Sequence, residues 1–504
     1  MIYYIGGFMI YKKNQINKKK IMIAEEKKRK FLLEGNLWKV ILYVTFPIII
    51  YLVFQVFFNS YDILFYKSSK GEVDKCFLPS MNRIHLVKDI LIPFGASIAT
   101  AGVILVGRNY GNKNIEKMRS YLSQTFILTV IVSFVITILF GFFLKTTILK
   151  NICDIKQNNP ANQTSLKNYY FVIILSIFCI IINTVFLALE RAKGNNKIIL
   201  ITTALNVFIK VILSNLFWNW KEDITSLGYA TLLAHAIVTV FAFWFLFWNH
   251  NNFLKIILKK LHFEKRFLKK LVPLAVPICI SNIIFILGKL IISITLTRYY
   301  GSEQGKVIDT QLILAVSINN IFSNIINSFA DSQNAIISQN LGQKNMNRVF
   351  QIFQKIMISI VVLAFLGTLI HIFCYRKILF YFMKETIERG STFKILLFYE
   401  TTGLFLTSFS IVLCNFLVCF KKTKIYLSMN LLRVFAGVLF LFILKKMDIF
   451  SSFTEELSNF HKVGLSLLLG NLISFIATLT FFIPFYRKLQ KENLAKMKIK
   501  RKIS

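Results

Sequence analysis

The chain has 504 residues, 55% of them hydrophobic, and a mean hydropathy of +0.60. This is more apolar surface than one soluble core can bury, so the composition excludes a soluble protein and indicates that the bilayer is the solvent. The net charge of +38 does not indicate nucleic acid as a partner, because Lys and Arg occur in short runs between apolar segments and not on one basic face.

Twelve stretches are apolar over the length that a membrane span requires, about twenty residues. In chain order they are 40–66, 86–107, 120–144, 168–189, 198–220, 224–249, 271–297, 310–337, 352–375, 395–420, 425–444 and 463–486. We therefore expect an all-α polytopic membrane protein with twelve transmembrane helices. The even number of spans places both termini on the same side.

The basic residues indicate the orientation and the domain boundary. Lys and Arg exceed Asp and Glu more strongly in the segments on the side of the termini, which predicts cytoplasmic termini in the cell membrane. The connection between spans six and seven carries seven basic residues and is the natural lobe boundary. The predicted parts are a basic N-terminal extension 1–36, a first lobe 37–254, a linker 255–270, a second lobe 271–486 and a basic tail 487–504.

The two lobes repeat each other in sequence. Pro47 and Pro277 lie at an offset of 230 residues, and the hexapeptides from Asn109 (NYGNKN) and from Asn340 (NLGQKN) share four of six residues. A weaker echo relates LNVFIKVIL from Leu205 to LRVFAGVLF, at an offset of 227. Because each repeat holds six spans, the halves are parallel, and such transporters bind substrate near mid-membrane between them. The pattern favours a carrier over a channel.

Ionisable residues inside the predicted spans are functional candidates, since each costs about 3 kcal/mol or more at mid-bilayer unless it is paired or hydrated. Asp62 lies late in span one, with Asn59 on the same helical face, so that a carboxylate and an amide can converge on a cation or a proton. Lys210 lies in span five, one turn after Asn206. It either pairs with Asp62 or extends its ammonium toward the membrane surface.

In the second lobe, spans seven, eight and eleven carry Lys289, Asp331 and Arg433. We expect a structural ion pair in which Asp331 neutralises one of the two cations. The sequence holds no carboxylate cluster with metal-ligand spacing and no catalytic or ATP-binding motif. We therefore expect neither an enzyme nor a metal site, and no cofactor apart from H⁺ or Na⁺ as coupling ion.

One segment carries a specific family resemblance. Residues 339–348 resemble the Q-N-x-G-x-x-N-x-x-R signature that follows the second helix of the second lobe in MATE (multidrug and toxic compound extrusion) carriers of the MOP flippase superfamily; the matching residues are Gln339, Asn340, Gly342, Asn345 and Arg348. The sequence from Asn59 to Asp62 is similar to the N-x-x-D-T/I of the first helix. Leu205-Asn206 and Gly228-Tyr-Ala-Thr231 fit the fifth and sixth helices.

The resemblance implies a carrier that exports organic, often cationic, compounds in antiport with H⁺ or Na⁺, with a first-helix Asp at the coupling site. The coupling residues it implies here are Asp62, Asn59, Asn206, Lys210 and Thr231. Lys210 departs from the family, in which members with a complete first-lobe site carry Asp at that position. A tethered ammonium competes with Na⁺ for carboxylate oxygens, so we expect proton coupling or very weak coupling.

Two other functions remain open. A flippase for lipid-linked oligosaccharides or lipids shares this architecture, and the basic side chains Lys210, Lys289 and Arg433 could line a cavity for an anionic head group. A degenerate carrier that serves as a receptor or scaffold would move no solute. The expected partners are a small organic substrate and membrane lipids, including anionic head groups. We expect a monomer that binds no nucleic acid.

Overall fold

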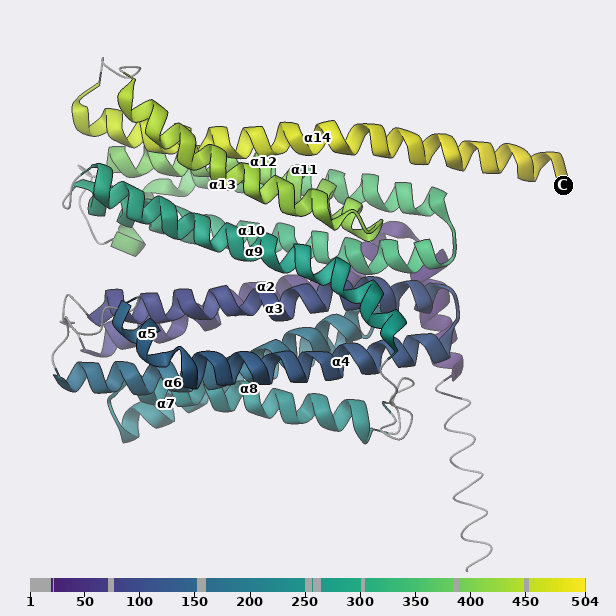
Figure 1. Cartoon of the computed structure of the whole chain (residues 1–504), viewed down its shortest axis with the longest axis horizontal. Helices are drawn as coiled ribbons and strands as arrows, with labels where there is room; N and C mark the ends of the chain where they lie inside the picture. The colour runs from purple at the N-terminus through teal and green to yellow at the C-terminus, as the bar shows by residue number, and fades with distance from the viewer. Residues whose placement is uncertain are drawn as a thin grey trace, which may run out of the picture. The chain divides into compact units, whose positions relative to one another are not determined.

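The computed structural model describes residues 20, 22–70, 77–151, 160–249, 256, 264–300, 304–383, 390–447 and 453–503. Over these residues the ordered structure is helical, without a strand (Figure 1). Besides a helical segment over 22–34, the elements are α2 (Leu37–Lys70), α3 (Phe77–Gly111), α4 (Ile115–Ile138), the π-helical turn η1 (Leu139–Phe143), α5 (Lys145–Asn151), α6 (Pro160–Ala192), α7 (Asn196–Trp220), α8 (Ile224–Phe247), α9 (Lys265–Tyr299), α10 (Gln304–Gly342), α11 (Met346–Met383), α12 (Gly390–Cys419), α13 (Thr423–Lys446) and α14 (Glu455–Ile503). Twelve helices in the described part of the chain are long and apolar enough to span a membrane, which confirms the predicted number.

The chain forms two compact units, each described separately below. Unit 1 comprises Met1–Pro47, Tyr61–Leu271 and Ser338–Lys344, and unit 2 comprises Ile48–Ser60, Val272–Ile337 and Asn345–Ser504. The change of unit after Leu271 falls beside the predicted linker 255–270, most of which lies outside the described residues. The predicted tail 487–504 continues α14 as one helix as far as Ile503.

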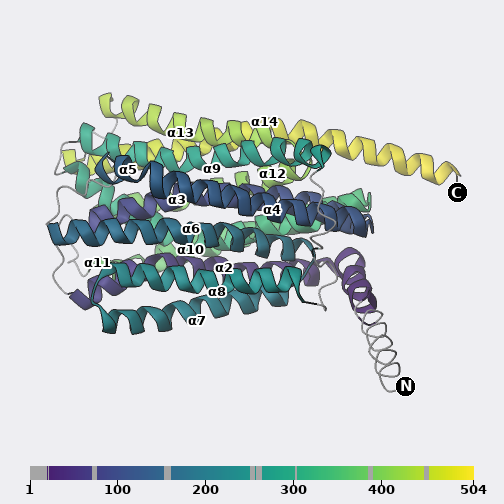
Figure 2. The same cartoon turned by 60° about the horizontal axis from the view of Figure 1, so that its bottom comes forward.

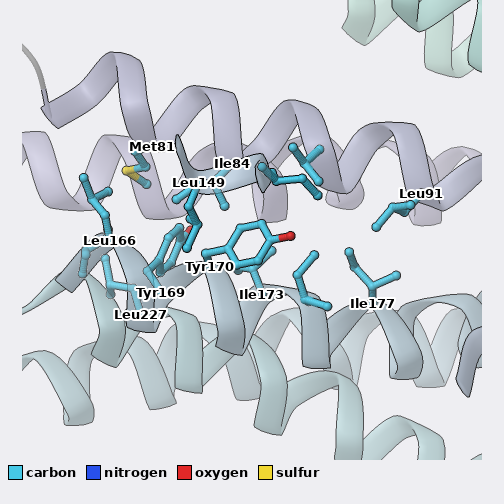
Figure 3. Close-up of a cluster of buried hydrophobic side chains, with 14 of the residues drawn as sticks. Met81, Ile84, Leu91, Leu149, Leu166, Tyr169, Tyr170, Ile173, Ile177 and Leu227 are labelled. Carbon is cyan, nitrogen blue, oxygen red and sulfur yellow. The ribbon is translucent and has the colours of Figure 1, made fainter. Parts of the chain in front are cut away.

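Unit 1 is packed around α6. The buried side chains of α6 pack against Ile84 and Leu91 of α3; they include Tyr169, Tyr170 and Ile177 (Figure 3). The hydroxyl of Tyr170 donates to the carbonyl of Phe140 at 2.9 Å, so that the ring is buried with its polar end satisfied. Between membrane helices, close van der Waals packing and such hydrogen bonds replace the hydrophobic effect as the source of stability. Polar side chains on α6 are thereby held in the interior of the unit.

Unit 2 is joined by aromatic packing between α11, α12 and α14. Phe353 lies 4.8 Å from Phe416 and 5.2 Å from Phe482 between ring centroids, and Tyr486 stacks on Phe482 at 5.4 Å. The first two pairs are tilted and the third is stacked, and aromatic pairs at such centroid distances add to the stability of packing. In both views α14 follows α13 along the membrane-spanning part (Figures 1 and 2). The aromatic cluster fixes these helices against each other.

The internal repeat is present in the turns. After α3, α6, α10 and α12 the chain reverses through one residue with positive φ: Lys113, Gly194, Lys344 and Lys421, respectively. Positive φ is uncommon for residues other than glycine. The same turn is used four times, with lysine at this position in three of them and glycine in the fourth. Corresponding interhelical bonds also occur at offsets of 230 and 227. Asn196 donates to the carbonyl of Tyr43 at 2.7 Å, and Thr423 donates to that of Pro273 at 3.0 Å.

Candidate functional site

The first candidate site lies where α7 and α8 meet in unit 1 (Figure 2). The side chain of Lys210 on α7 is 1% exposed, and its Nζ donates to Oγ1 of Thr231 on α8. The Thr231 hydroxyl in turn donates to the carbonyl of Leu227 at 3.1 Å. The ammonium of Lys210 therefore lies inside the helix bundle and does not extend to the membrane surface. Two of the predicted coupling residues, Lys210 and Thr231, are brought together.

A second polar layer extends this site onto α6. The amide of Asn206, one turn before Lys210, lies 3.5 Å from Nδ1 of His235. Asn183 of α6 donates to the carbonyl of His235 at 3.0 Å, and its own side-chain oxygen accepts from Thr239 at 3.0 Å. Three helices thus share a hydrogen-bonded network. Polar networks of this kind in lipid hold helices in one register and can carry a proton.

Asp62 and Asn59 lie on α2, but their side chains are outside the described residues. The pairing of Asp62 with Lys210 therefore stays a prediction.

Sequence reasoning missed Lys88, a further buried cation in unit 1. Lys88 of α3 is 3% exposed, although it lies in a membrane-spanning segment that begins at Arg83. The charges of Lys88 and Lys210 both act on His85 and on His235, so the two lysines share one region of the unit. The signal was present in the sequence, since the Lys-Asp pair at 88–89 interrupts an otherwise apolar stretch. Lys88 lies in the first turn of the predicted span, where a lysine is expected to reach water, so its burial could not be predicted.

The second candidate site lies in unit 2, around the ring of Phe285 on α9. The Nζ of Lys289 lies 4.9 Å from the ring centroid, and the guanidinium carbon of Arg433, from α13, lies 4.6 Å from it. Glu400 of α12 is the carboxylate whose charge acts on both cations. Asp331, on α10, acts on Tyr426. The predicted ion pair between Asp331 and a cation stays a prediction. Glu400, which the sequence places near the outer end of span ten, is a further participant.

The signature loop forms a close contact at the end of α10. The ideal Cβ position at Gly342 would overlap the carbonyl oxygen of Arg108, and the corresponding position at Gly111 would overlap that of Gln339. The two glycines of the repeated hexapeptide therefore let the ends of α3 and α10 touch through their backbones. Gln339 adds a hydrogen bond at 3.0 Å to the carbonyl of Ala192 at the end of α6. Asn340 beside it is fully buried.

The segment 22–34 binds to this same end of unit 1. Arg29 donates to the carbonyl of Tyr110 at 3.0 Å and to that of Gly111 at 2.6 Å. A cation at a helix C-terminus satisfies free carbonyls and complements the helix dipole. Lys28 donates to Asn195 and to Glu25, and burial lowers the pKa of Lys28 below its ordinary value while Glu25 opposes that change.

Asn345 of the signature caps a helix. Its side-chain oxygen accepts from the backbone N–H of Arg348 at 3.2 Å, as that of Asn114 accepts from Lys117 at 3.0 Å in the first repeat. Loss of such a cap costs about 1 kcal/mol. We expect Asn345→Ala to lower the unfolding temperature of purified protein, whereas Asn345→Ser, which keeps an acceptor, stays close to the wild type. Equal melting of the alanine and serine variants would contradict the capping role.

Within the described part of the chain, no group of three or more His, Cys, Asp or Glu side chains is placed to hold a metal ion. The candidate sites consist of lysine, arginine, amide, hydroxyl and imidazole groups, together with the carboxylate of Glu400 near Lys289 and Arg433. Such groups bind or transfer protons and ions and orient polar ligands.

A known family matches both sequence repeats of this chain. The MatE family profile matches residues 47–216 and 277–443. The probable multidrug resistance protein YoeA of Bacillus subtilis is 23% identical over 311 residues, which cover 59% of this chain and 64% of that protein. The match therefore spans somewhat less than two thirds of YoeA.

Solved structures show the same fold. A MOP superfamily transporter from Pyrococcus furiosus, described as having a binding pocket of reverse polarity, aligns with a TM-score of 0.81 at 16% identity, over 91% of this chain and 98% of that one. A multidrug resistance MATE transporter in its outward-facing conformation gives 0.80 at 16% identity, over 92% and 98%. The fold and the buried polar sites define a multi-pass membrane transporter. The chain belongs to the MatE family, whose members are transporters and not enzymes.

Proposed function

We propose that this protein is a secondary active transporter that exports organic compounds in antiport with H⁺. The observation that carries the proposal is the ammonium of Lys210, which is buried in unit 1 against Thr231, one helical turn from Asn206. A buried charge inside a membrane bundle is costly and is a functional candidate for that reason. The protein would act as a monomer in the cell membrane with both termini in the cytoplasm, as the distribution of basic residues indicates.

In this proposal Asp62 is the coupling carboxylate and Lys210 is its partner when no proton is bound. Protonation of Asp62 would discharge the pair and leave the ammonium to its bond with Thr231. Helices α7 and α8 would then be free to move relative to α2. Because Lys210 competes with Na⁺ for the carboxylate oxygens, the same site would bind Na⁺ poorly. Proton coupling follows from this competition.

Transport by the purified protein in liposomes tests the proposal. A fluorescent organic compound is included, and either a proton gradient or a sodium gradient is imposed. We expect the proton gradient to drive movement of the compound. Movement driven by a sodium gradient alone, at clamped pH and voltage, would overturn proton coupling. Absence of movement under every gradient would favour the receptor or scaffold.

The variant Lys210→Ala separates the role of the ammonium from the rest of the site. Removing the ammonium leaves the oxygens of Asp62 open to Na⁺, so we expect Na⁺ to stimulate transport by this variant. The matched control is Lys145→Ala, because Lys145 belongs to the same unit and lies over the ring of Phe171 at 5.1 Å, away from this network. A Lys210→Ala protein that folds and shows the ion dependence of the control would argue against the role of Lys210.

A lipid flippase is the second candidate, and the cations around Phe285 favour it because phosphate head groups are anionic. The Pyrococcus furiosus transporter is described as a MOP superfamily member whose binding pocket of reverse polarity suggests a different function. A flippase would move a fluorescent lipid between leaflets of the liposome. An exporter would move the soluble compound and leave the lipid in place.

A further inference from the structure

The helical segment 22–34 packs on unit 1 through an apolar face. Leu32 is fully buried and Leu33 is 2% exposed, whereas Lys30, on the opposite face of the segment, is exposed. Leu32 lies against Gly194 in the turn after α6, where an added Cβ would come within 2.5 Å of Cδ1 of the leucine. Burial of apolar side chains therefore seats the segment on unit 1, in addition to its polar contacts.

The same segment joins the end of α3 to the end of α6. Lys28 donates to the side-chain oxygen of Asn195 at 2.5 Å, and the amide of Asn195 donates to Glu190 at 2.7 Å. Glu190 is fully buried in α6. Arg29, the next residue of the segment, binds the last two carbonyls of α3. Because helix C-termini leave carbonyl groups without an intrahelical partner, one short segment fixes two helix ends.

The end of α10 is held by those same two helix ends. Gly342 lies against the backbone of α3, and Gln339 donates at 3.0 Å to the carbonyl of Ala192, the last residue of α6. Residues Ser338–Lys344 are packed with unit 1, whereas α10 as far as Ile337 belongs to unit 2. The last part of α10 therefore changes unit at the place that the segment holds.

Gly111 gives the segment a direct influence on α10. Arg29 donates to the carbonyl of Gly111 at 2.6 Å, and an added Cβ at Gly111 would overlap the carbonyl oxygen of Gln339. Without Arg29, the last turn of α3 would have free carbonyls and would open more often. The backbone surface on which α10 ends would then lose its fixed position.

We propose that segment 22–34 is a strap that holds this end of unit 1 closed by keeping the end of α10 seated on α3 and α6. A carrier built from two parallel repeats moves one half against the other. Residues 338–344 must then stay with unit 1 or leave it when the preceding part of α10 moves with unit 2. The bound strap favours the seated arrangement, and its release favours departure. This inference goes beyond the proposed function, because it concerns control of the movement and not the substrate or the coupling ion.

Hydrogen–deuterium exchange of the full-length protein in phosphatidylcholine nanodiscs tests the strap. Exchange of a protected amide reports the population of the locally open form. We expect Arg29→Gln and Leu32→Ala each to speed exchange in the peptide 338–344 at least about tenfold, the size expected for loss of charge-assisted hydrogen bonds or of a buried leucine side chain. Lys30→Gln is the matched control, because Lys30 is an exposed cation of the same segment. It should exchange as the wild type does.

A second measurement follows opening of this end directly. Ser338 is fully buried, and Ser338→Cys places a thiol there with little change in size. We expect N-ethylmaleimide to modify this thiol about tenfold faster when it is combined with Arg29→Gln than when it is combined with Lys30→Gln. The same proteins with serine at position 338 correct for reaction of the native cysteines.

Unchanged exchange at 338–344 in folded Arg29→Gln would overturn the proposal. Faster exchange without faster labelling would also overturn it, because the end of α10 would then fray without leaving its seat. If Leu32→Ala fails to fold, the comparison of positions 29 and 30 decides. Neither measurement uses a gradient, so failure of proton antiport would leave this test unchanged.

Discussion

Replacing Gly342 with alanine is expected to reduce transport at least about tenfold and to lower thermal stability, the effect of an overpacked contact of about 1–3 kcal/mol. A Cβ at this position would overlap the carbonyl oxygen of Arg108. The obstacle is backbone and cannot rotate away, so the ends of α3 and α10 would have to separate. Liposome transport and unfolding of the purified protein measure both consequences.

Gly437→Ala is the matched control for that variant. Gly437 is buried within α13, and a Cβ there would meet nothing within 4 Å. Alanine is favoured over glycine inside a helix by about 0.5–1 kcal/mol, so this variant should be as stable as the wild type or more so. Wild-type melting and transport by Gly342→Ala would show that the two helix ends do not need to touch.

Replacing Asp62 with asparagine is expected to abolish gradient-driven transport while the protein remains folded. Asparagine keeps the size and polarity of the side chain but cannot take up and release a proton, so a proton gradient would no longer be coupled to substrate. The measurement is uptake or efflux in liposomes under an imposed proton gradient, with the melting temperature as the check on folding.

Asp309→Asn serves as the control for Asp62→Asn. Asp309 is also a carboxylate of a membrane-spanning helix, in the segment Val307–Gly342, and it accepts a hydrogen bond from Ser293 at 2.7 Å in unit 2. We expect its variant to retain gradient-driven transport. If Asp62→Asn transports as well as Asp309→Asn does, the coupling carboxylate lies elsewhere.

The sequence predicted the number of helices and the repeat because span length and apolar content are local properties. The segment 339–348, which carries the family signature, lies at the end of α10 and the beginning of α11. The sequence could not predict that Gly111 and Gly342 touch, since glycine at a helix end is explained equally well by a turn. In these turns the residue with positive φ is Lys113 or Lys344, two residues after the glycine. The glycines are therefore not required by the turn and serve the contact between helices.

The charged sites were only partly predictable. Lys210 was recognised as an intramembrane cation, but its bond to Thr231 depends on how α7 and α8 face each other, which periodicity does not specify. Glu400 is near the end of its predicted span, so the sequence is equally consistent with exposure to water. Its influence on Arg433 follows from the packing of α12 and α13 in three dimensions. Partners of buried charges are long-range properties and cannot be obtained from spacing along the chain.

The contacts of Arg29 make the segment 22–34 a structural part of unit 1. The basic segment before the first span has the composition of a soluble appendage, yet residue 29 satisfies the last carbonyls of α3. It acts as a helix cap supplied by a part of the chain about eighty residues away. An affinity tag placed ahead of residue 22 leaves that cap intact, whereas a fusion that replaces residues 22–34 removes it and exposes the end of α3 to solvent.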